Sequence, residues 1–83
     1  MTPLRVLVVE DNALNRRLVQ ALLELRAHTV IEAGSVKEGR ERLREGRPDI
    51  AILDIHIPGG GGELLLAEIR ADPALASLPC IAV

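Results

Sequence analysis

The sequence predicts an α/β domain built on a doubly wound parallel sheet, with four strands and three helices. Four apolar segments alternate with stretches in which apolar residues recur at helical spacing. The apolar segments are nearly continuous, which is typical of parallel strands that are covered on both faces. Because strands and helices alternate along the chain, right-handed crossovers are the expected connections.

The composition excludes several classes of protein. Hydrophobic residues make up 48% of the 83 residues and none is aromatic, so we expect a folded domain with an aliphatic core. Ten Lys and Arg against twelve Asp and Glu leave a net charge of −2, which argues against nucleic acid and anionic membranes as partners. No apolar run approaches the roughly twenty residues of a membrane-spanning helix. The single cysteine, Cys80, cannot form an intrachain disulfide and fits a reducing cytoplasm.

The first part of the chain predicts a strand, a helix and a second strand. Residues 4–9 form the first strand, and a helical period begins after Asn12. Residues 29–33 form the second, short strand. The apolar stripe of the helix between them consists of Leu14, Leu18, Ala21, Leu22 and Leu25.

The second helix has a start signal in the sequence. Ser35 and Glu38 have the spacing of a capping box, in which the Ser side chain accepts a hydrogen bond from the backbone three residues later. The helix is expected to run to about Glu45, with Gly46 as the residue that follows its end. Because its apolar stripe is thin, we expect this helix to be the least firmly held of the three. The stripe consists of Val36 and Leu43, with Gly39 between them.

The remaining elements are a strand, a helix and a final strand. Residues 50–53 form a third buried strand, which stops at Asp54. A helix follows the glycines at 59–62 and ends near Ala71. Residues 79–83 form the fourth strand.

Acidic residues follow two of the predicted strands. Glu10 and Asp11 end the first strand, and Asp54 ends the third. If these strands are neighbours, three carboxylates converge at one edge of the sheet, where their repulsion favours a bound cation. Hard oxygen ligands suit Mg²⁺. The alternative for Asp11 is a cap on the following helix, whereas Asp54 has no packing role at the end of a buried strand.

Several segments of the chain resemble the response-regulator receiver domain. They occur in the correct order, with gaps of the expected size, and they span the whole chain. This likeness is far more specific than a single short motif. The segments are residues 8–12 (Val-Val-Glu-Asp-Asn) with Asn15 and Arg16, residues 27–30 with Ala33, residues 48–58, and residues 79–83.

The resemblance implies a flavodoxin-like fold with the sheet order 2-1-3-4-5, and a role in a histidine-to-aspartate phosphorelay rather than as an enzyme. Asp54 would be the phospho-acceptor, and the donor would be a phosphohistidine on a sensor histidine kinase or phosphotransfer protein. Glu10 and Asp11 would hold Mg²⁺ together with Asp54, and the main-chain carbonyl of His56 would complete the protein ligands. This fits the chemistry, because a carboxylate attacks an anionic phosphoryl group poorly until a divalent cation neutralises charge.

The chain departs from the family's pattern in two places. The loop that usually reads Pro-x-Met-Asp-Gly consists here of Pro58, Gly59, Gly60, Gly61 and Gly62, and we expect so many glycines to make it mobile. The chain also stops before the positions of the family's switch Ser or Thr and its Lys. The one lysine present, Lys37, belongs to the second helix and cannot replace that Lys. We therefore expect residues 1–83 to be the N-terminal part of a receiver domain, without the fifth strand and the last helices.

Three other functions are weighed against this one. A truncated receiver with impaired signalling would act as a self-associating interaction module, and the apolar edge Cys80–Val83 predicts a homodimer or larger assembly. A small phosphohydrolase needs an acid or base, but His56 stands where its second carboxylate would be. A nucleotide-binding loop at residues 59–62 lacks the Gly-Lys-Ser/Thr ending, and Glu63 places negative charge at its mouth. The cognate kinase, and whether the domain is free-standing or part of a larger kinase, stay open.

Overall fold

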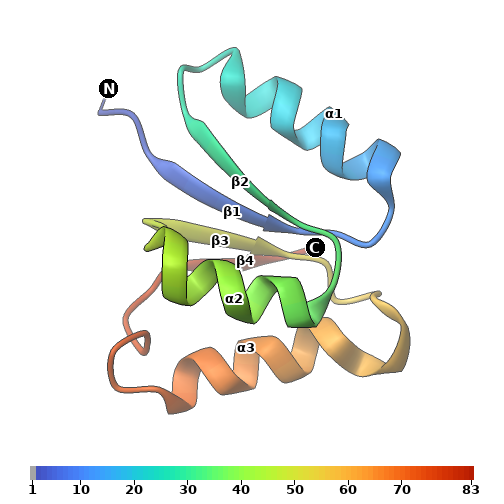
Figure 1. Cartoon of the computed structure of the whole chain (residues 1–83), viewed down its shortest axis with the longest axis vertical. Coiled ribbons are helices and arrows are strands. Elements are labelled where there is room, and N and C mark those ends of the chain that lie inside the picture. Colours follow the sequence, from blue (N-terminus) through green and yellow to red (C-terminus); the bar gives the residue numbers. More distant parts are fainter. Residues whose placement is uncertain (1) are drawn as a thin grey trace.

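Four parallel strands form one sheet in the computed structural model, which describes residues 2–83 (Figure 1). Their order across the sheet is β2-β1-β3-β4, so the flavodoxin-like, doubly wound and incomplete sheet predicted from the sequence is confirmed. Every neighbouring pair is parallel. The strands are β1 (Arg5–Val9), β2 (Thr29–Ala33), β3 (Ile50–Leu53) and β4 (Cys80–Ala82).

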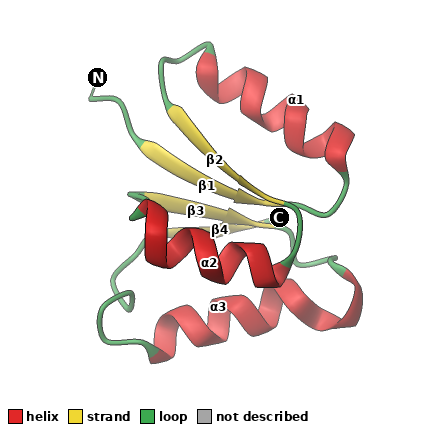
Figure 2. Ribbon diagram, in the orientation of Figure 1, coloured by secondary structure: helices red, strands yellow, loops and turns green. Residues whose placement is uncertain are grey.

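Three helices cover the two faces of the sheet. Helix α1 (Ala13–Glu24) lies over one face, and α2 (Val36–Gly46) and α3 (Gly61–Ala71) lie over the other (Figure 2). A single 3₁₀ turn, Pro58–Gly60, leads into α3. Within residues 2–83 no helix combines the length and the apolar character needed to cross a bilayer.

The main hydrophobic core lies between the sheet and the α2–α3 layer. Its side chains come from alternate positions of β1 and β3 and from the inner sides of the two helices. Leu7 and Leu53 are completely buried, and burial of each such side chain contributes about 1.5–3 kcal/mol. This core holds β1 and β3 side by side. It comprises Leu7, Val9, Ala33, Leu43, Ala51, Leu53, Ile57, Leu65 and Ile69.

Glycine makes α2 a well-packed helix despite its thin apolar stripe. A Cβ atom at Gly39 would lie 2.9 Å from Cδ2 of Leu65 and 3.2 Å from Cγ2 of Val9, so the missing side chain lets α2 approach the core closely. Gly39 and Leu43 are both buried. The expectation that α2 is the least firmly held helix is therefore not supported by its burial, because close backbone approach replaces side-chain area.

The two ends of α2 differ in how well the sequence predicts them. The Ser35 side chain accepts a hydrogen bond from the Glu38 backbone N–H at 3.1 Å, which confirms the cap. The expected C-terminus is wrong by one residue, because Gly46 is still helical and Arg47 takes the left-handed conformation with φ of 44°. At Gly46 a Cβ atom would lie 2.9 Å from Cδ1 of Ile31. This glycine therefore provides close packing against β2 and leaves the turn to the next residue.

Helix α1 exposes the leucine stripe that the sequence predicts as its apolar side. None of the residues of α1 is buried. Leu14, in the first turn, is 76% exposed, and Leu25, directly after the helix, is 79% exposed. The half-buried positions lie on the opposite side of the helix, which faces β1 and β2; they are Arg16, Val19, Gln20 and Leu23. The predicted helix is confirmed, but its stripe of leucines faces away from the sheet, and α1 is the least buried of the three helices.

Candidate functional site

Parallel pairing brings the two acidic strand ends to one edge of the sheet. Val9, the last residue of β1, pairs with Leu53, the last residue of β3. The Asp54 backbone N–H continues this ladder by donating to the Val9 carbonyl at 3.0 Å. On the other side of β1, the Glu10 backbone N–H donates to the Ala33 carbonyl at 3.0 Å. The residues that follow β1 and β3 are therefore neighbours, as the sheet order requires.

Three carboxylates meet at this edge. One oxygen from each of Glu10, Asp11 and Asp54 can be chosen so that all three lie within 4.8 Å of one another. The predicted convergence of the three side chains is confirmed. Asp54 is only 9% exposed, whereas Asp11 is exposed to solvent. Hard oxygen donors at this spacing fit Mg²⁺, which takes one or two protein carboxylates together with water or phosphate oxygens.

Backbone donors orient two of these carboxylates. The His56 backbone N–H donates to Oδ1 of Asp54 at 2.8 Å, and the Asn12 backbone N–H donates to Oε1 of Glu10 at 3.0 Å. Each bond engages one oxygen of the carboxylate and leaves the second for another ligand. The main-chain carbonyl of His56 belongs to the same loop, and its role as a metal ligand stays a prediction.

Asn12, rather than Asp11, caps α1. The Asn12 side-chain oxygen accepts a hydrogen bond from the Asn15 backbone N–H at 3.0 Å. The alternative interpretation of Asp11 as the helix cap is therefore wrong, because the residue after it already fills that position. The Asp11 carboxylate is left within the acidic cluster.

The electrostatics of the cluster are unfavourable for Glu10. Burial raises the pKa of the Glu10 carboxyl above its ordinary value of 4.5, and contact with Asp54 raises it further. The hydrogen bond from the Asn12 backbone acts in the opposite direction and is the second largest influence on this pKa. A cation among the three carboxylates would remove most of this penalty, so the donor set fits a divalent metal ion.

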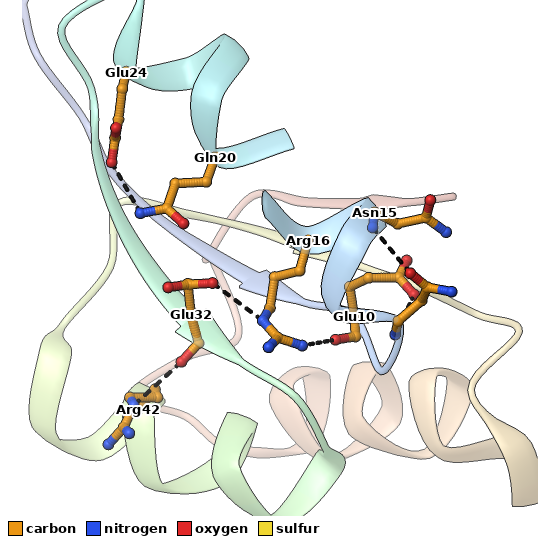
Figure 3. A network of polar contacts seen from close by, with 8 residues as sticks. Glu10, Asn15, Arg16, Gln20, Glu24, Glu32 and Arg42 are labelled. Atoms are coloured by element: carbon orange, nitrogen blue, oxygen red, sulfur yellow. Dashed lines mark hydrogen bonds and ion pairs between the residues drawn. The ribbon is translucent and has the colours of Figure 1, made fainter. Parts of the chain in front are cut away.

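Arg16 ties the site to β2. Its guanidinium donates through Nη1 to the Glu10 carbonyl at 2.8 Å and through Nε to the Glu32 carboxylate at 3.1 Å (Figure 3). The Arg16 side chain is 19% exposed and the Glu32 side chain is 40% exposed, so water still reaches the Glu32 end of this ion pair. Sequence reasoning singled out Arg16 only as part of a resemblance. The charge of Arg16 on the side of α1 that faces the sheet is the feature of the sequence that points to this bridging role.

The glycines after Asp54 serve two different purposes. Gly59 and Gly60 form the turn with φ of 81° and 70°, a left-handed conformation that favours glycine. Gly61 and Gly62 are the first two residues of α3 and are buried, so the prediction that this helix begins after Gly62 is wrong. A Cβ atom on Gly62 would overlap the Asp54 carbonyl, which means that glycine is needed for α3 to start so close to the site. The expected mobility of the loop stays a prediction.

The chain also matches a known protein family. Residues 6–83 match the response regulator receiver domain, and this match includes both acidic strand ends. The chain belongs to the response regulator receiver family. Receiver domains are signalling domains of two-component systems, as the resemblance implied.

Two relatives show the range of proteins in which such a receiver domain occurs. The polar-differentiation response regulator DivK of Brucella anthropi is 35% identical over 81 residues, which are 98% of this receiver domain and 66% of DivK. The sensor histidine kinase AruS of Pseudomonas aeruginosa is 43% identical over 70 residues, or 84% of this chain and 7% of that kinase. The chain thus spans about two thirds of the length of the DivK regulators that it matches.

Solved receiver structures have the same arrangement of elements. The N-terminal domain of a response regulator receiver protein from Methanoculleus marisnigri superposes with a TM-score of 0.92 at 30% identity. The match covers 98% of this receiver and 66% of that chain. A response regulator receiver protein from Pseudomonas putida superposes with a TM-score of 0.89 at 32% identity, covering 100% of this receiver and 69% of that chain.

Proposed function

We propose that this receiver domain accepts a phosphoryl group on Asp54 in a histidine-to-aspartate phosphorelay. The observation that carries the proposal is the meeting of three carboxylates within 4.8 Å, with the least exposed of them at the end of β3. Mg²⁺ would be held by Glu10, Asp11 and Asp54, with the main-chain carbonyl of His56 as a further ligand. When bound, Mg²⁺ neutralises the negative charge that accumulates as an anionic phosphoryl group approaches a carboxylate.

The hydrogen bond from the His56 backbone distinguishes the two carboxylate oxygens of Asp54. Because Oδ1 accepts the hydrogen bond from the His56 backbone, we assign Oδ2 as the nucleophile. Its attack forms an oxygen–phosphorus bond while the nitrogen–phosphorus bond of a phosphohistidine breaks, and the electron pair returns to the imidazole nitrogen. The product is an acyl phosphate on Asp54. In this reaction the protein contributes mainly position and electrostatic stabilisation.

The exposed leucine stripe of α1 supports a protein as the phosphoryl donor. The stripe begins at Leu14, three residues after Asp11, and Leu18 is 60% exposed. Apolar side chains that continue from the acidic cluster would pack against a histidine kinase or phosphotransfer protein and exclude water from the site. The substitution Leu18→Asp should slow phosphoryl transfer to Asp54 from a phosphorylated kinase or phosphotransfer protein. It should leave transfer from a small acyl phosphate unchanged.

The switch Ser or Thr and the Lys of the family pattern do not occur within residues 1–83. The only lysine, Lys37, is exposed in the first turn of α2, and no Ser or Thr follows Ser77. We propose that residues 1–83 are the N-terminal part of a receiver domain, because they span 66% of the length of DivK from Brucella anthropi. The domain receives a group rather than turning over a substrate, and its single cysteine agrees with a reducing cytoplasm. The alternative is a signalling-impaired module that self-associates.

Mass spectrometry after incubation with a small acyl phosphate and Mg²⁺ tests the proposal. We expect one phosphoryl group on the unmodified chain, lost when a chelator removes Mg²⁺, and none on Asp54→Asn. The variant Asp49→Asn is a matched control, because Asp49 is an exposed acidic residue at the opposite end of β3. Equal labelling of Asp54→Asn and the unmodified chain would remove Asp54 from the mechanism. No labelling of a folded chain would favour the self-associating module.

A further inference from the structure

The peptide group between Glu10 and Asp11 is the point at which the chain leaves the sheet next to the acidic cluster. The Glu10 backbone N–H still makes a sheet bond, to the Ala33 carbonyl of β2 at 3.0 Å. Bonds recur evenly along a parallel ladder, but β2 ends at Ala33, so no β2 residue follows that could donate to the Glu10 carbonyl. Arg16 supplies that donor instead, since its Nη1 lies 2.8 Å from the Glu10 carbonyl oxygen.

The structure leaves room for this guanidinium beside β2 and holds it there. A Cβ atom at Gly34 would lie 3.2 Å from Nη1 of Arg16, so a larger residue would crowd the bond. On its other side the guanidinium donates through Nε to the Glu32 carboxylate at 3.1 Å (Figure 3). The Glu32 carbonyl in turn accepts a hydrogen bond from Nε of Arg42 in α2 at 3.3 Å. Arg16 is therefore fixed between the end of β1 and an anchored residue of β2.

Two of the three carboxylates in the cluster depend on the peptide group that Arg16 holds. A peptide group is planar, so fixing its oxygen also fixes how the chain continues to Glu10 on one side and to Asp11 on the other. Asp54 is held separately, by the ladder between β1 and β3 and by the hydrogen bond from the His56 backbone. Arg16 thus acts on the cluster through the main chain.

We infer that Arg16 is a positioning residue for Mg²⁺ binding, and that Glu32 keeps its guanidinium in place. By holding the carbonyl that joins them, Arg16 fixes the placement of the Glu10 and Asp11 carboxylates. Mg²⁺ demands near-ideal octahedral geometry, so a rotation of this peptide group weakens binding. Groups that orient metal ligands in this way typically change metal affinity by about 10–100-fold. The inference rests on the proposed function, which places Mg²⁺ at this cluster.

Charge and position predict opposite effects for Arg16. Its guanidinium is a cation close to a cation site, so its charge by itself opposes the binding of Mg²⁺. If Arg16 acted through charge alone, Arg16→Gln would tighten Mg²⁺ binding and Arg16→Lys would leave it unchanged. If Arg16 acts through position, both variants weaken binding, because neither side chain reproduces two N–H groups directed at the Glu10 carbonyl and at Glu32.

NMR titration with Mg²⁺ measures the dissociation constant of each variant. We expect Arg16→Lys and Arg16→Gln each to raise it by about 10-fold or more, and Glu32→Gln to raise it as well. The double variant Arg16→Gln/Glu32→Gln should bind no more weakly than Arg16→Gln, since the two residues act as one unit. The matched control is Arg17→Gln, which removes the same charge from the neighbouring, exposed position of α1.

Hydrogen exchange without Mg²⁺ gives a second readout. The Asn12 N–H donates to Oε1 of Glu10 at 3.0 Å, so it should exchange faster in Arg16→Lys. The Asp54 N–H, which belongs to the ladder with β1, should exchange as in the unmodified chain. Circular dichroism shows whether each variant is folded, and Glu32→Gln, at a 40% exposed side chain, carries the test if an Arg16 variant unfolds.

Two results would overturn the inference and leave the proposed function standing, provided that the unmodified chain binds Mg²⁺ and is labelled on Asp54. One is Mg²⁺ binding by folded Arg16 variants that is as tight as in the unmodified chain, or tighter. The other is an equal loss of affinity in Arg17→Gln. An unmodified chain that binds no Mg²⁺ would overturn the inference together with the metal site of the proposed function.

Discussion

Gly62, the second residue of α3, packs directly against the main-chain carbonyl of Asp54. A Cβ atom at this position would overlap both the carbonyl oxygen and the carbonyl carbon of Asp54. The residue that we assign as the phospho-acceptor thus has the start of a helix pressed against its backbone, and no side chain fits between them. The geometry of the site therefore depends on a residue eight positions away that carries no functional group.

The substitution Gly62→Ala should destabilise the domain and weaken Mg²⁺ binding. Overpacking against backbone costs about 2–3 kcal/mol, because either β3 or α3 must shift. The control is Gly60→Asn, since nothing lies within 4 Å of a Cβ atom at Gly60 and Asn tolerates its left-handed backbone, so the cost should stay below about 1 kcal/mol. Urea unfolding compares the two, and similar losses in both variants would contradict this account.

Adjacent leucines at the start of α3 should differ strongly in their contribution to stability. Leu65 is 1% exposed in the core, whereas Leu64 is 51% exposed. Leu65→Ala should lower the free energy of unfolding by about 2–5 kcal/mol through lost burial and a cavity. Leu64→Ala should change it by no more than about 0.5 kcal/mol. Chemical denaturation measures both, and equal effects would mean that the helix is rotated from the orientation described.

Mg²⁺ titration should perturb a small set of backbone amide signals. We expect the largest shifts at Glu10, Asp11 and Asp54, because each offers an oxygen to the same small volume. Heteronuclear NMR follows these shifts, and Glu10→Gln should weaken binding because it removes one charged donor. Shifts confined to the glycines at 59–62 would show that the ion binds elsewhere.

Stability should depend on the ionisation of Glu10. Its pKa is raised in the folded chain, chiefly by burial, so the folded state holds this proton more tightly than the unfolded state does. The resulting stabilisation is fully present below pH 4.5 and is lost as the pH rises through the raised pKa. Mg²⁺ affinity should increase across the same window, because the ion competes with the proton.

The variant Glu10→Gln isolates this contribution. Its free energy of unfolding, relative to the unmodified chain, should rise with pH across the window, since glutamine does not ionise. Unfolding curves at a series of pH values without Mg²⁺ measure the difference. A difference that is constant with pH would show that Glu10 titrates normally in the folded chain.

Lysine should not be able to replace arginine at position 16. It bridges the Glu10 carbonyl and the Glu32 carboxylate with two separate nitrogen atoms, which a lysine ammonium cannot reproduce in the same geometry. Arg16→Lys should cost about 1–2 kcal/mol of stability. Arg17→Lys, at the neighbouring exposed position, should stay within about 0.5 kcal/mol. If both variants unfold alike, Arg16 does not organise the site.

Much of the fold and the acidic cluster follows from local patterns. The strands were predictable within about a residue because their apolar segments are short and bounded by polar residues, as with residues 50–53 before Asp54. The convergence of Glu10 and Asp54 was predictable because parallel neighbours end at the same edge of a sheet. The Ser35 cap was predictable because the bond spans only three residues.

Other features were decided by the tertiary structure, because they depend on atoms that are far apart in the sequence. The side of α1 that meets the sheet is set by packing against β1 and β2. The spacing of the leucines alone therefore could not show whether their stripe is buried or exposed. The need for glycine at Gly39 and Gly62 comes from Leu65 and Asp54, which lie on other segments.

The sequence by itself determined the alternation of elements, the sheet order implied by the resemblance, and the acidic residues at the strand ends. Only the tertiary structure decided that Arg16 bridges Glu10, directly after β1, and Glu32 in β2. The physical reason is that periodicity and strand ends are properties of neighbouring residues, whereas hydrogen-bond partners and close packing are properties of pairs that only folding brings together.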